Sequence, residues 1–483
     1  MLPRRSIAFY ASLVLLIAGC QPVDHQLNKQ TVLLESRQKN HTRSAVFADI
    51  IAPGREEGSN VKSERSVAPT AGQQPPADND GCFVGLAISG GGSRSANFAA
   101  ACMFQLERAG LLQKVDYIST VSGGSLAGAY YCVSDDSQWN PQNVQRKLTQ
   151  KFATELIKRT FLPWNDLAFV FGDWNRSDLL ANVFTERLFS QNGRALTFGD
   201  LRADRPRLLI NSTDVASARR FVFCNETFDE LNSDLSRYPL SYAVTASSAV
   251  PVLLHPVAIQ DFSTDFPQFH QLVDGGVTDN LGVQTLVETY ASQVRQAADQ
   301  GRPPPYPRGA VFILIDAHTR VNNALAEKRD IGLIASLKAA AALTSTALLN
   351  RASSATLAEI IVNGARDDET AAEMRRDIAQ LNEQGFLHFT DKRNHPVRVL
   401  YLSLSQVSTL HNIPYGSFGE NVNTMGTYFN IKPGEAYSLY ESAELLMKER
   451  FEGKVREILQ EIGGEAGSGF GVQGSDSKSE ERK

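Results

Sequence analysis

Two strand–turn–helix units constrain the fold of this chain more than any other feature of its sequence. Each unit has a short apolar or β-branched run that predicts a buried strand, then a turn of glycine and serine, then a segment with helical spacing. The units comprise residues 82–89, 90–92 and 94–109, and residues 115–121, 122–124 and 126–133. Strands that alternate with helices predict an α/β fold, in which a mostly parallel central sheet is flanked by helices.

Later segments continue this pattern. Further strands are predicted at residues 207–211, 221–224, 310–315 and 397–404, and an Ala- and Leu-rich helical region at 331–362.

The expected globular domain covers residues 80–460. Its first part, 82–285, carries the chemical motifs, and residues 286–460 are expected to complete the sheet and to cover it. Residues 21–79 contain few aromatic side chains and a Pro-, Gln- and Ala-rich stretch, which predicts a flexible tether. The Gly- and Ser-rich residues 461–483 predict a disordered tail.

Residues 1–20 predict a secretory signal peptide. Arg4 and Arg5 give the segment a positive start, and the apolar run 7–17 that follows is too short to span a bilayer comfortably. The ending Ile17-Ala18-Gly19-Cys20 resembles a bacterial lipobox, in which the cysteine is diacylated and becomes the mature N-terminus. An ordinary signal peptide with a chance cysteine, or an uncleaved anchor helix, remains open.

The lipobox resemblance implies a location. Gln21, rather than Asp, follows Cys20, and this favours the outer membrane in lipoproteins of this kind. Two or three acyl chains give stable anchoring where one chain is marginal. We therefore expect a lipid-anchored protein of the bacterial cell envelope, held to the membrane through acylated Cys20.

Charge and cysteine content exclude several classes of protein. Lys and Arg number 48 against 53 Asp and Glu, a net charge of −5, so no basic excess indicates nucleic-acid binding. Five cysteines in 483 residues do not make a disulfide scaffold, and no CxxC or HExxH spacing indicates a metal site. We expect neither a metal nor a cofactor. Cys82, Cys102, Cys132 and Cys224 lie in apolar contexts, which favours buried free thiols, although an oxidising compartment would permit pairing.

The first chemical motif is Ser89-Gly90-Gly91-Gly92-Ser93-Arg94, between a predicted strand and a predicted helix. A glycine run in this position lets backbone N–H groups point into one concavity, helped by the positive end of the helix. Such a site holds a phosphate or a developing oxyanion. A glycine-rich packing turn is the alternative.

The second motif is Thr120-Val121-Ser122-Gly123-Gly124, at a strand-to-helix turn. It matches the GxSxG nucleophile elbow except at Thr120, and the small residues after the serine suit the close approach of strand and helix. A shifted frame would make Ser125 the nucleophile. We prefer Ser122, because it directly follows the β-branched run, whereas Ser125 would lie a turn into the helix.

The third motif is Val273-Asp274-Gly275-Gly276, with Asp279 and Asn280 close behind. An apolar residue before Asp-Gly-Gly indicates a carboxylate at a strand end or in a tight loop, and an ordinary turn is the alternative. Asp279 and Asn280 are expected to cap the segment after the loop, or to support Asp274.

In this order, the three motifs resemble those of the patatin-like phospholipases. The matching residues are Gly90-Gly91-Gly92-Ser93-Arg94, Ser122-Gly123-Gly124 and Asp274-Gly275-Gly276. The stretch Ala246-Ser247-Ser248-Ala249-Val250-Pro251, with His255-Pro256-Val257 after it, is similar to the segment ahead of the family's aspartate. The resemblance covers about residues 82–285 and implies a patatin-like three-layer α/β fold. The chain departs from the family pattern at Ser89, Ser95 and Thr120.

The resemblance also implies a Ser–Asp dyad that works without histidine. Ser122 would be the nucleophile and Asp274 the general base, and the N–H groups of Gly91, Gly92 and Gly123 would form the oxyanion hole. The residues that would support this machinery are Gly90, Arg94, Gly124, Gly275 and Gly276. Arg94 would position the loop of glycines 90–92, called the glycine loop below, or meet a lipid phosphate.

A Ser-His-Asp triad is the alternative to the dyad. Its candidate bases are His255, His270 and His318. His255 precedes a proline in an apolar stretch, which favours a core histidine.

The function implied by the resemblance is hydrolysis of carboxylic ester bonds in phospholipids or related lipids through an acyl-enzyme. A small-ester esterase or a thioesterase is an alternative within the same class. A different class is a lipoprotein that kept the fold, lost turnover and acts in lipid binding or envelope assembly. Thr120 favours that loss, whereas the intact Ser122, Asp274 and glycine loop favour activity.

Overall fold

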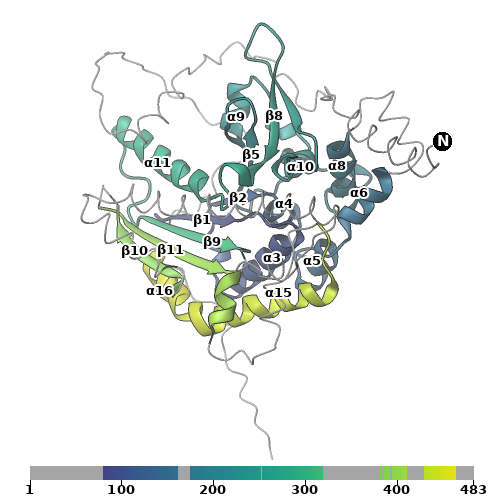
Figure 1. Ribbon diagram of the computed structural model, residues 1–483. Coiled ribbons are helices and arrows are strands. Elements are labelled where there is room, and N and C mark those ends of the chain that lie inside the picture. The colour runs from purple at the N-terminus through teal and green to yellow at the C-terminus, as the bar shows by residue number, and fades with distance from the viewer. Residues whose placement is uncertain are drawn as a thin grey trace, which may run out of the picture.

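The computed structural model describes residues 80–160, 175–251, 253–318, 381, 384–391, 394–410 and 429–463 (Figure 1). The predicted signal peptide with Cys20, the tether over 21–79, the helical region 331–362 and residues 464–483 of the predicted tail lie outside these residues. The domain boundaries drawn in those regions therefore stay predictions.

A nine-stranded sheet forms the centre of the described body. Its order is β10-β11-β9-β1-β2-β5-β8-β7, and β6 also pairs with β5. The strands are β1 (Phe83–Ile88), β2 (Tyr117–Val121), β5 (Arg207–Asp214), β6 (Arg219–Phe223), β7 (Val257–Asp261), β8 (Gln268–Asp274), β9 (Ala310–Asp316), β10 (Phe386–Thr390) and β11 (Pro396–Ser403). The five central strands β11, β9, β1, β2 and β5 pair in parallel, whereas β10, β6, β8 and β7 join in antiparallel pairs. A separate small hairpin joins β3 (Ser190–Gln191) to β4 (Arg194–Ala195).

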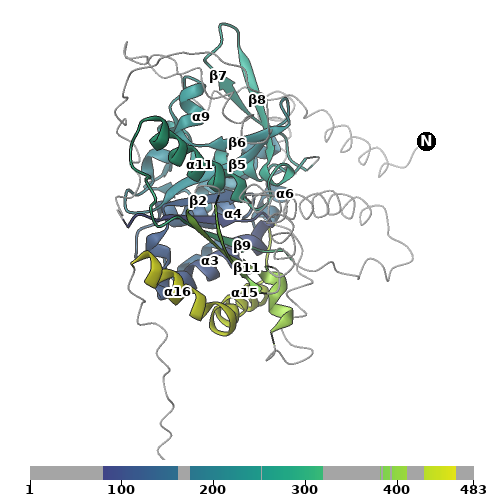
Figure 2. The ribbon, with the colours of Figure 1, turned by 90° about the vertical axis from the view of Figure 1, so that its left-hand side faces the viewer.

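Helices cover both faces of the sheet. They are α3 (Gly92–Ala109), α4 (Gly124–Val133), α5 (Pro141–Leu148), α6 (Phe152–Thr160), α8 (Arg176–Arg187), α9 (Asn225–Glu230), α10 (Leu240–Ser247), α11 (Val283–Asp299), α15 (Pro433–Leu446) and α16 (Glu452–Ile462). Figure 2 shows α3, α15 and α16 on one side of the sheet and α11 on the other. Within the described ranges, no helix combines the length and the apolar character of a membrane span.

The sheet separates two hydrophobic cores, as the alternation along β1 illustrates. Val84, Leu86 and Ile88 belong to the core that includes α3, α4 and α15, whereas Phe83 and Ala87 belong to the core that includes α11. A strand buried on both faces reads as a continuous apolar run, which is the pattern that predicts a strand at residues 82–89. The three-layer α/β fold class predicted from the sequence is confirmed.

Both strand–turn–helix units are present where the sequence predicts them. The helices α3 and α4 begin at Gly92 and Gly124, two residues earlier than the predicted starts at 94 and 126. Of the later segments, β5 is longer than predicted, because it continues from Asn211 to Asp214. The described residues beyond 286 add β9, β10 and β11 to the sheet and place α15 against α3.

The edge of β5 that faces β2 is shared by two strands. Parallel β2 pairs with β5 as far as Val121 opposite Asn211, and antiparallel β8 takes over with Asp274 opposite Ser212. Both must lie on the same edge, because β6 pairs with Asn211 and Ser212 from the other side. The two strands therefore meet end to end, and the residues at their ends become neighbours.

Candidate active site

Ser122 lies in the turn between β2 and α4. Its φ of 49° falls in the left-handed region, which is uncommon for a residue other than glycine and marks a strained turn. A Cβ on Gly123 would lie 2.1 Å from the carbonyl oxygen of Gly92, and a Cβ on Gly124 would lie 2.6 Å from that of Ser89. The turn therefore needs both glycines to pack against the glycine loop, as a nucleophile elbow does.

Thr120 is accommodated by a glycine in the facing helix. A Cβ on Gly128 of α4 would lie 2.5 Å from the Cγ2 methyl of Thr120. Because Gly128 has no side chain, the helix leaves room for the threonine side chain, which is larger than the glycine of the GxSxG pattern. The Thr120 hydroxyl donates to the carbonyl of Leu209 at 3.4 Å. The departure from GxSxG at this position leaves the close approach of strand and helix intact.

The glycine loop joins β1 to α3 and runs beside the elbow. Gly91 and Gly92 have φ of 141° and 60°, conformations that favour glycine. The Ser95 hydroxyl donates to the Ser89 carbonyl at 2.5 Å, and the Ser89 hydroxyl accepts from the Ala317 N–H at 3.0 Å. The two serines at which the chain departs from the family pattern therefore brace the loop against its own helix and against the end of β9.

Three backbone donors around Ser122 face no protein acceptor. The N–H groups of Gly91, Gly92 and Gly123 donate to nothing within the described part of the chain. The first N–H groups of a helix have no partner within it, and Gly91 and Gly123 directly precede α3 and α4. These groups have the chemistry of an oxyanion hole.

Asp274 ends β8 next to Ser122. The Ser122 hydroxyl donates to Asp274 Oδ2 at 2.9 Å, and the Gly276 N–H donates to Oδ1 at 2.8 Å. Only 6% of Asp274 is exposed, and this burial raises the pKa of its carboxyl group to about 6, although both hydrogen bonds act in the opposite direction. The carboxylate is therefore ionised at neutral pH and basic enough to accept a proton.

Asp279 and Asn280 act on the backbone around this pair. Asp279 Oδ1 accepts from the N–H groups of Leu281 and Gly282, both at 3.0 Å, just before α11 begins. The Gly90 N–H donates to the Asn280 carbonyl at 3.0 Å. Asp279 thus has the capping contacts expected from the sequence, and Asn280 ties down the glycine loop.

The three candidate histidines make other contacts. The imidazole Nδ1 of His270 lies 3.5 Å from Asp214, and the carbonyl of His255 accepts from Ser177. His318 follows β9, and burial lowers the pKa of its imidazole. No imidazole in the described part of the chain is hydrogen-bonded to Ser122 or Asp274, whose side chains bond to each other directly.

Arg94 lies beneath the glycine loop, and 8% of it is exposed. A Cβ on Gly91 would lie 3.7 Å from its guanidinium Nη2. Burial lowers the pKa of Arg94 to about 10, and the charge of Asp316 at the end of β9 partly opposes this effect. Asp316 in turn accepts from the Tyr401 hydroxyl at 2.7 Å. The placement favours loop positioning over contact with a lipid phosphate, the two roles considered for Arg94.

Sequence reasoning did not single out a polar network beneath the elbow. The Ser122 N–H donates to Ser247 Oγ at 2.8 Å, and the Ser247 hydroxyl donates to the Asn211 carbonyl at 2.6 Å. The Asn211 amide donates to Thr120 O and to Ser119 Oγ. Ser125, the alternative nucleophile, lies inside α4 with its hydroxyl 3.2 Å from Ser247 Oγ. The stretch 246–251, which resembles the family's segment ahead of the aspartate, is the part of the sequence that could have indicated this network. Nothing in it identifies the Ser122 N–H as the partner of Ser247.

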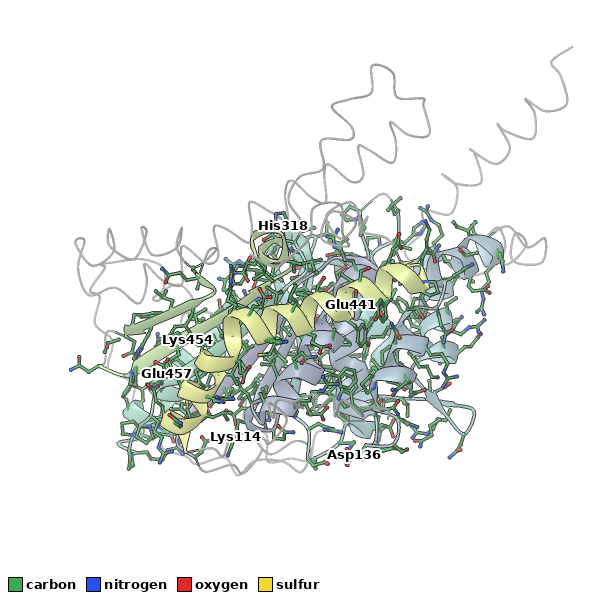
Figure 3. All side chains as sticks on the ribbon, turned by 90° about the horizontal axis from the view of Figure 1, so that it is seen from below. Lys114, Asp136, His318, Glu441, Lys454 and Glu457 are labelled. Atoms are coloured by element: carbon green, nitrogen blue, oxygen red, sulfur yellow. The ribbon has the colours of Figure 1, made fainter. Side chains whose placement is uncertain are left out.

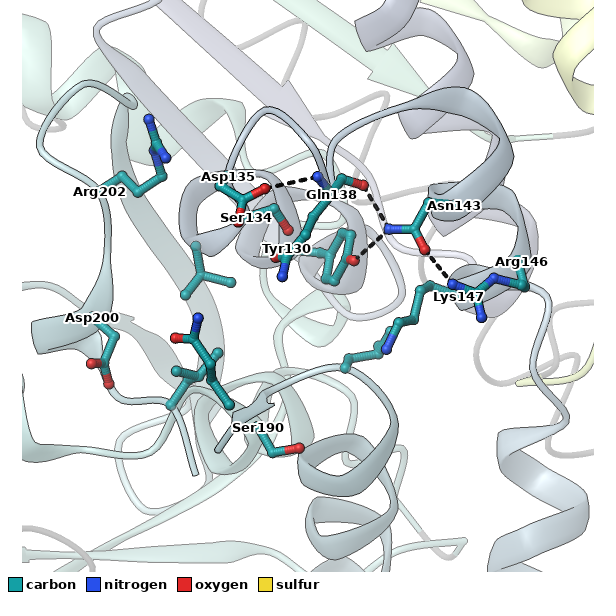
Figure 4. Close-up of a pocket in the computed structure, with 14 residues that line it drawn as sticks. Tyr130, Ser134, Asp135, Gln138, Asn143, Arg146, Lys147, Ser190, Asp200 and Arg202 are labelled. Carbon is teal, nitrogen blue, oxygen red and sulfur yellow. Dashed lines mark hydrogen bonds between the residues drawn. The ribbon is translucent and has the colours of Figure 1, made fainter. Parts of the chain in front are cut away.

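A cavity of about 440 Å³ lies at the other end of α4 (Figure 4). Its lining includes Tyr130 and Asn143, whose side chains are hydrogen-bonded at 3.1 Å. Neither Ser122 nor Asp274 lines it. Figure 3 shows that Asp136, next to this end of α4, lies on the opposite side of the body from His318 at the end of β9. The cavity is thus separate from the Ser–Asp pair.

All four described cysteines carry free thiols. Burial raises the pKa of Cys82, Cys102, Cys132 and Cys224 above the ordinary value of a thiol. Cys82, Cys102 and Cys132 are buried and Cys224 is half-buried. None has the lowered pKa that a reactive cysteine needs.

A comparison with protein-family models agrees with the motif order. Residues 86–287 match the family model for patatin-like phospholipase, and this range contains the glycine loop, Ser122 and Asp274. No curated protein matches the chain. Among solved structures, human GIVD cytosolic phospholipase A2 is similar with 13% identity and a TM-score of 0.45, over 80% of this chain and 63% of that chain. VipD from Legionella pneumophila is similar with 13% identity and a TM-score of 0.25, over 75% of this chain and 67% of that chain.

Proposed function

Residues 86–287 form a patatin-like phospholipase domain, and on this premise we propose that the chain is a serine lipid acyl hydrolase. Its substrates would be the carboxylic esters of phospholipids or related lipids. The observation that carries the proposal is the 2.9 Å hydrogen bond from Ser122 Oγ to Asp274 Oδ2, in a turn with glycine-rich backbone donors beside it.

In the first half-reaction, Ser122 Oγ attacks the ester carbonyl carbon while its proton moves to Asp274 Oδ2. The carbonyl oxygen becomes an oxyanion, which accepts hydrogen bonds from the N–H groups of Gly91, Gly92 and Gly123. One such donor is typically worth about 3–4 kcal/mol of transition-state stabilisation. Collapse of the intermediate breaks the bond to the leaving alcohol, which takes the proton from Asp274 and departs, and the acyl group stays on Ser122.

In the second half-reaction, Asp274 takes a proton from water, and the resulting hydroxide attacks the acyl carbon. The new oxyanion occupies the same donors, and its collapse breaks the bond to Ser122 Oγ. The proton on Asp274 returns to Ser122, and the fatty acid leaves. The raised pKa of Asp274, about 6, suits a group that must both accept and return a proton near neutral pH.

The test is a lipid panel combined with active-serine labelling. Wild-type protein should hydrolyse a phospholipid and react covalently with a fluorophosphonate, whereas Ser122→Ala should do neither. Ser125→Ala is the matched control, because it removes the hydroxyl of the alternative nucleophile, three residues further on in the first turn of α4, and it should keep most of the labelling. Label that survives Ser122→Ala but is lost with Ser125→Ala would assign the nucleophile to the shifted frame.

The same experiment separates the alternative functions. Hydrolysis of small esters without lipid hydrolysis would indicate an esterase. A folded wild-type protein that neither labels nor hydrolyses any ester would contradict the enzyme proposal and favour a lipid-binding or assembly role.

We also propose that Cys20 carries the acyl chains of an outer-membrane lipoprotein. The support is the sequence Ile17-Ala18-Gly19-Cys20 after a short apolar run. Cys20→Ser should abolish incorporation of a labelled fatty acid and block lipoprotein signal cleavage. Equal labelling of both forms would contradict the anchor, and fractionation of the wild-type membranes would test its location.

A further inference from the structure

Ser247 connects three elements of the site. It ends α10, it is fully buried, and its hydroxyl both accepts from the Ser122 N–H at 2.8 Å and donates to the Asn211 carbonyl of β5 at 2.6 Å. The Ser247 side chain therefore links the turn at Ser122, the helix α10 and the strand β5, with which both β2 and β8 pair.

The Ser122 backbone needs such a partner. A non-glycine residue in the left-handed region is strained, and it persists only where its surroundings fix it. A buried N–H group without an acceptor destabilises the fold further. Because the chain turns at Ser122, neither β2 nor α4 supplies an acceptor for this group, and Ser247 Oγ does so.

The segment 247–249 also holds the backbone of Asp274, the hydrogen-bond partner of Ser122. The Asp274 N–H donates to the Ala249 carbonyl at 3.0 Å, two residues after Ser247. The backbone nitrogens of Ser122 and Asp274 are thus anchored to one stretch of chain, although 152 residues separate them in sequence.

We propose that Ser247 is a positioning residue, which together with the Ala249 carbonyl sets the separation of Ser122 Oγ and Asp274 Oδ2. This inference rests on the proposed hydrolase function. Ser247 acts through the backbone of Ser122 and does not itself touch the substrate. Its loss should therefore lower kcat and leave KM nearly unchanged.

Ser248 offers a matched control. It is the next residue and equally buried, and its hydroxyl has no hydrogen-bond partner within the described residues. Ser248→Ala removes the same atom from the same stretch without touching the Ser122 backbone. Ser247→Thr keeps the hydroxyl and adds one methyl group, so it should fall between wild type and Ser247→Ala.

The experiment measures kcat and KM, the rate of fluorophosphonate labelling, and amide hydrogen exchange in the peptide that contains Ser122. In Ser247→Ala, we expect kcat and labelling to fall about 10- to 100-fold, the cost of a small misplacement of a reacting group. KM should stay within about 2-fold, since the variant changes no substrate contact. Exchange at Ser122 should become faster, and Ser248→Ala should resemble wild type in every measurement.

Two results would overturn the inference: equal kcat in Ser247→Ala and Ser248→Ala, or a loss of kcat with unchanged exchange at Ser122. Failure of the proposed function looks different, because the wild-type protein would then show no Ser122-dependent hydrolysis or labelling. In that case the exchange measurement alone decides whether Ser247 anchors the turn, since it requires no turnover.

Discussion

The two members of the Ser–Asp pair come from regions built in different ways. Ser122 belongs to the parallel half of the sheet, where β1–α3 and β2–α4 follow one another closely and the glycines at their turns bring them into contact. Asp274 belongs to the antiparallel half, where β8 meets β5 through pairs between residues far apart in sequence. Ser122 is placed by local backbone geometry, and Asp274 by long-range register.

The difference shows that the contact between Ser122 and Asp274 depends on a single junction, the point on the edge of β5 where the ends of β2 and β8 meet. Val121 and Asp274 face adjacent residues of β5, Asn211 and Ser212. A shift of one residue in the pairing of β8 would turn the Asp274 side chain to the other face of the sheet. Gly275 fixes the junction sterically, because a Cβ there would lie 2.2 Å from the Asn211 carbonyl oxygen.

The largest effect should come from removing either member of the pair. Asp274→Asn and Ser122→Ala should each lower the rate of ester hydrolysis by about 10⁴-fold or more, because groups that act as a unit fail together. His255→Ala, His270→Ala and His318→Ala should each stay within about 10-fold of wild type, a loss of about 1.4 kcal/mol or less. Initial rates of folded variants with matched stability provide the measurement. A histidine variant as inactive as Asp274→Asn would reject the dyad and favour the triad.

The second effect is on the free energy of unfolding, and it comes from Asp274 in the antiparallel half of the sheet. The folded-state pKa of Asp274, about 6, lies above its ordinary value of 3.8, so the folded protein loses stability as pH rises from 4 through 6. The shift corresponds to about 3 kcal/mol. Part of this loss occurs below pH 4, where the unfolded-state carboxyl already ionises, so relative to wild type Asp274→Asn should gain about 2 kcal/mol in free energy of unfolding between pH 4 and pH 8. Denaturant unfolding at both pH values measures it, and a constant difference between the two proteins would contradict the buried carboxylate.

The third effect is the pH dependence of the reaction. The base must be ionised, so kcat/KM should rise with pH through about 6 and level off above 7. At pH 5, the rate should be about 10-fold below the plateau, because one pKa unit separates the pH from the pKa. An uncharged ester substrate keeps its own titration out of the profile. A flat profile between pH 5 and 8 would show that Asp274 is not the titrating base.

The smallest effect tests the parallel half. Gly128→Ala would ordinarily favour a helix, but here the new methyl group would meet Thr120 Cγ2 at 2.5 Å. We expect a net loss of about 1 kcal/mol in free energy of unfolding, since overpacking exceeds the gain in helix propensity. The matched background is Thr120→Ser, which lacks that methyl group, and there Gly128→Ala should be neutral or stabilising. Equal effects of Gly128→Ala in both backgrounds would contradict the compensation.

The sequence predicts the parallel half well because its signals are local. Apolar runs, helical spacing and glycine turns lie within a few residues of one another between residues 82 and 133, and the fold follows them closely. Ser122 and the glycine loop can therefore be located from the amino-acid sequence alone. Their catalytic roles stay predictions.

The antiparallel half has weaker local signals. The predicted strand at 207–211 stops before Ser212, Thr213 and Asp214, whose polar side chains do not resemble a buried strand, yet these three residues pair with β8. The strand β8 itself, QFHQLVD, begins with polar and half-buried residues. Register between such strands depends on partners more than 50 residues away, so Asp274 could be proposed as the base only through the resemblance, and Ser247 not at all.

Under the proposed function, the shared edge of β5 would also determine when the chain becomes competent for catalysis. The hydrogen bond between Ser122 and Asp274 closes a loop of 152 residues, and contacts of such length are costly to form before the rest of the chain is ordered. A folding intermediate with β1, β2, α3 and α4 in place would hold a strained serine and no base. Hydrolytic activity would thus appear only when β8 docks, which makes its recovery during refolding a reporter of the last long-range pairing rather than of collapse.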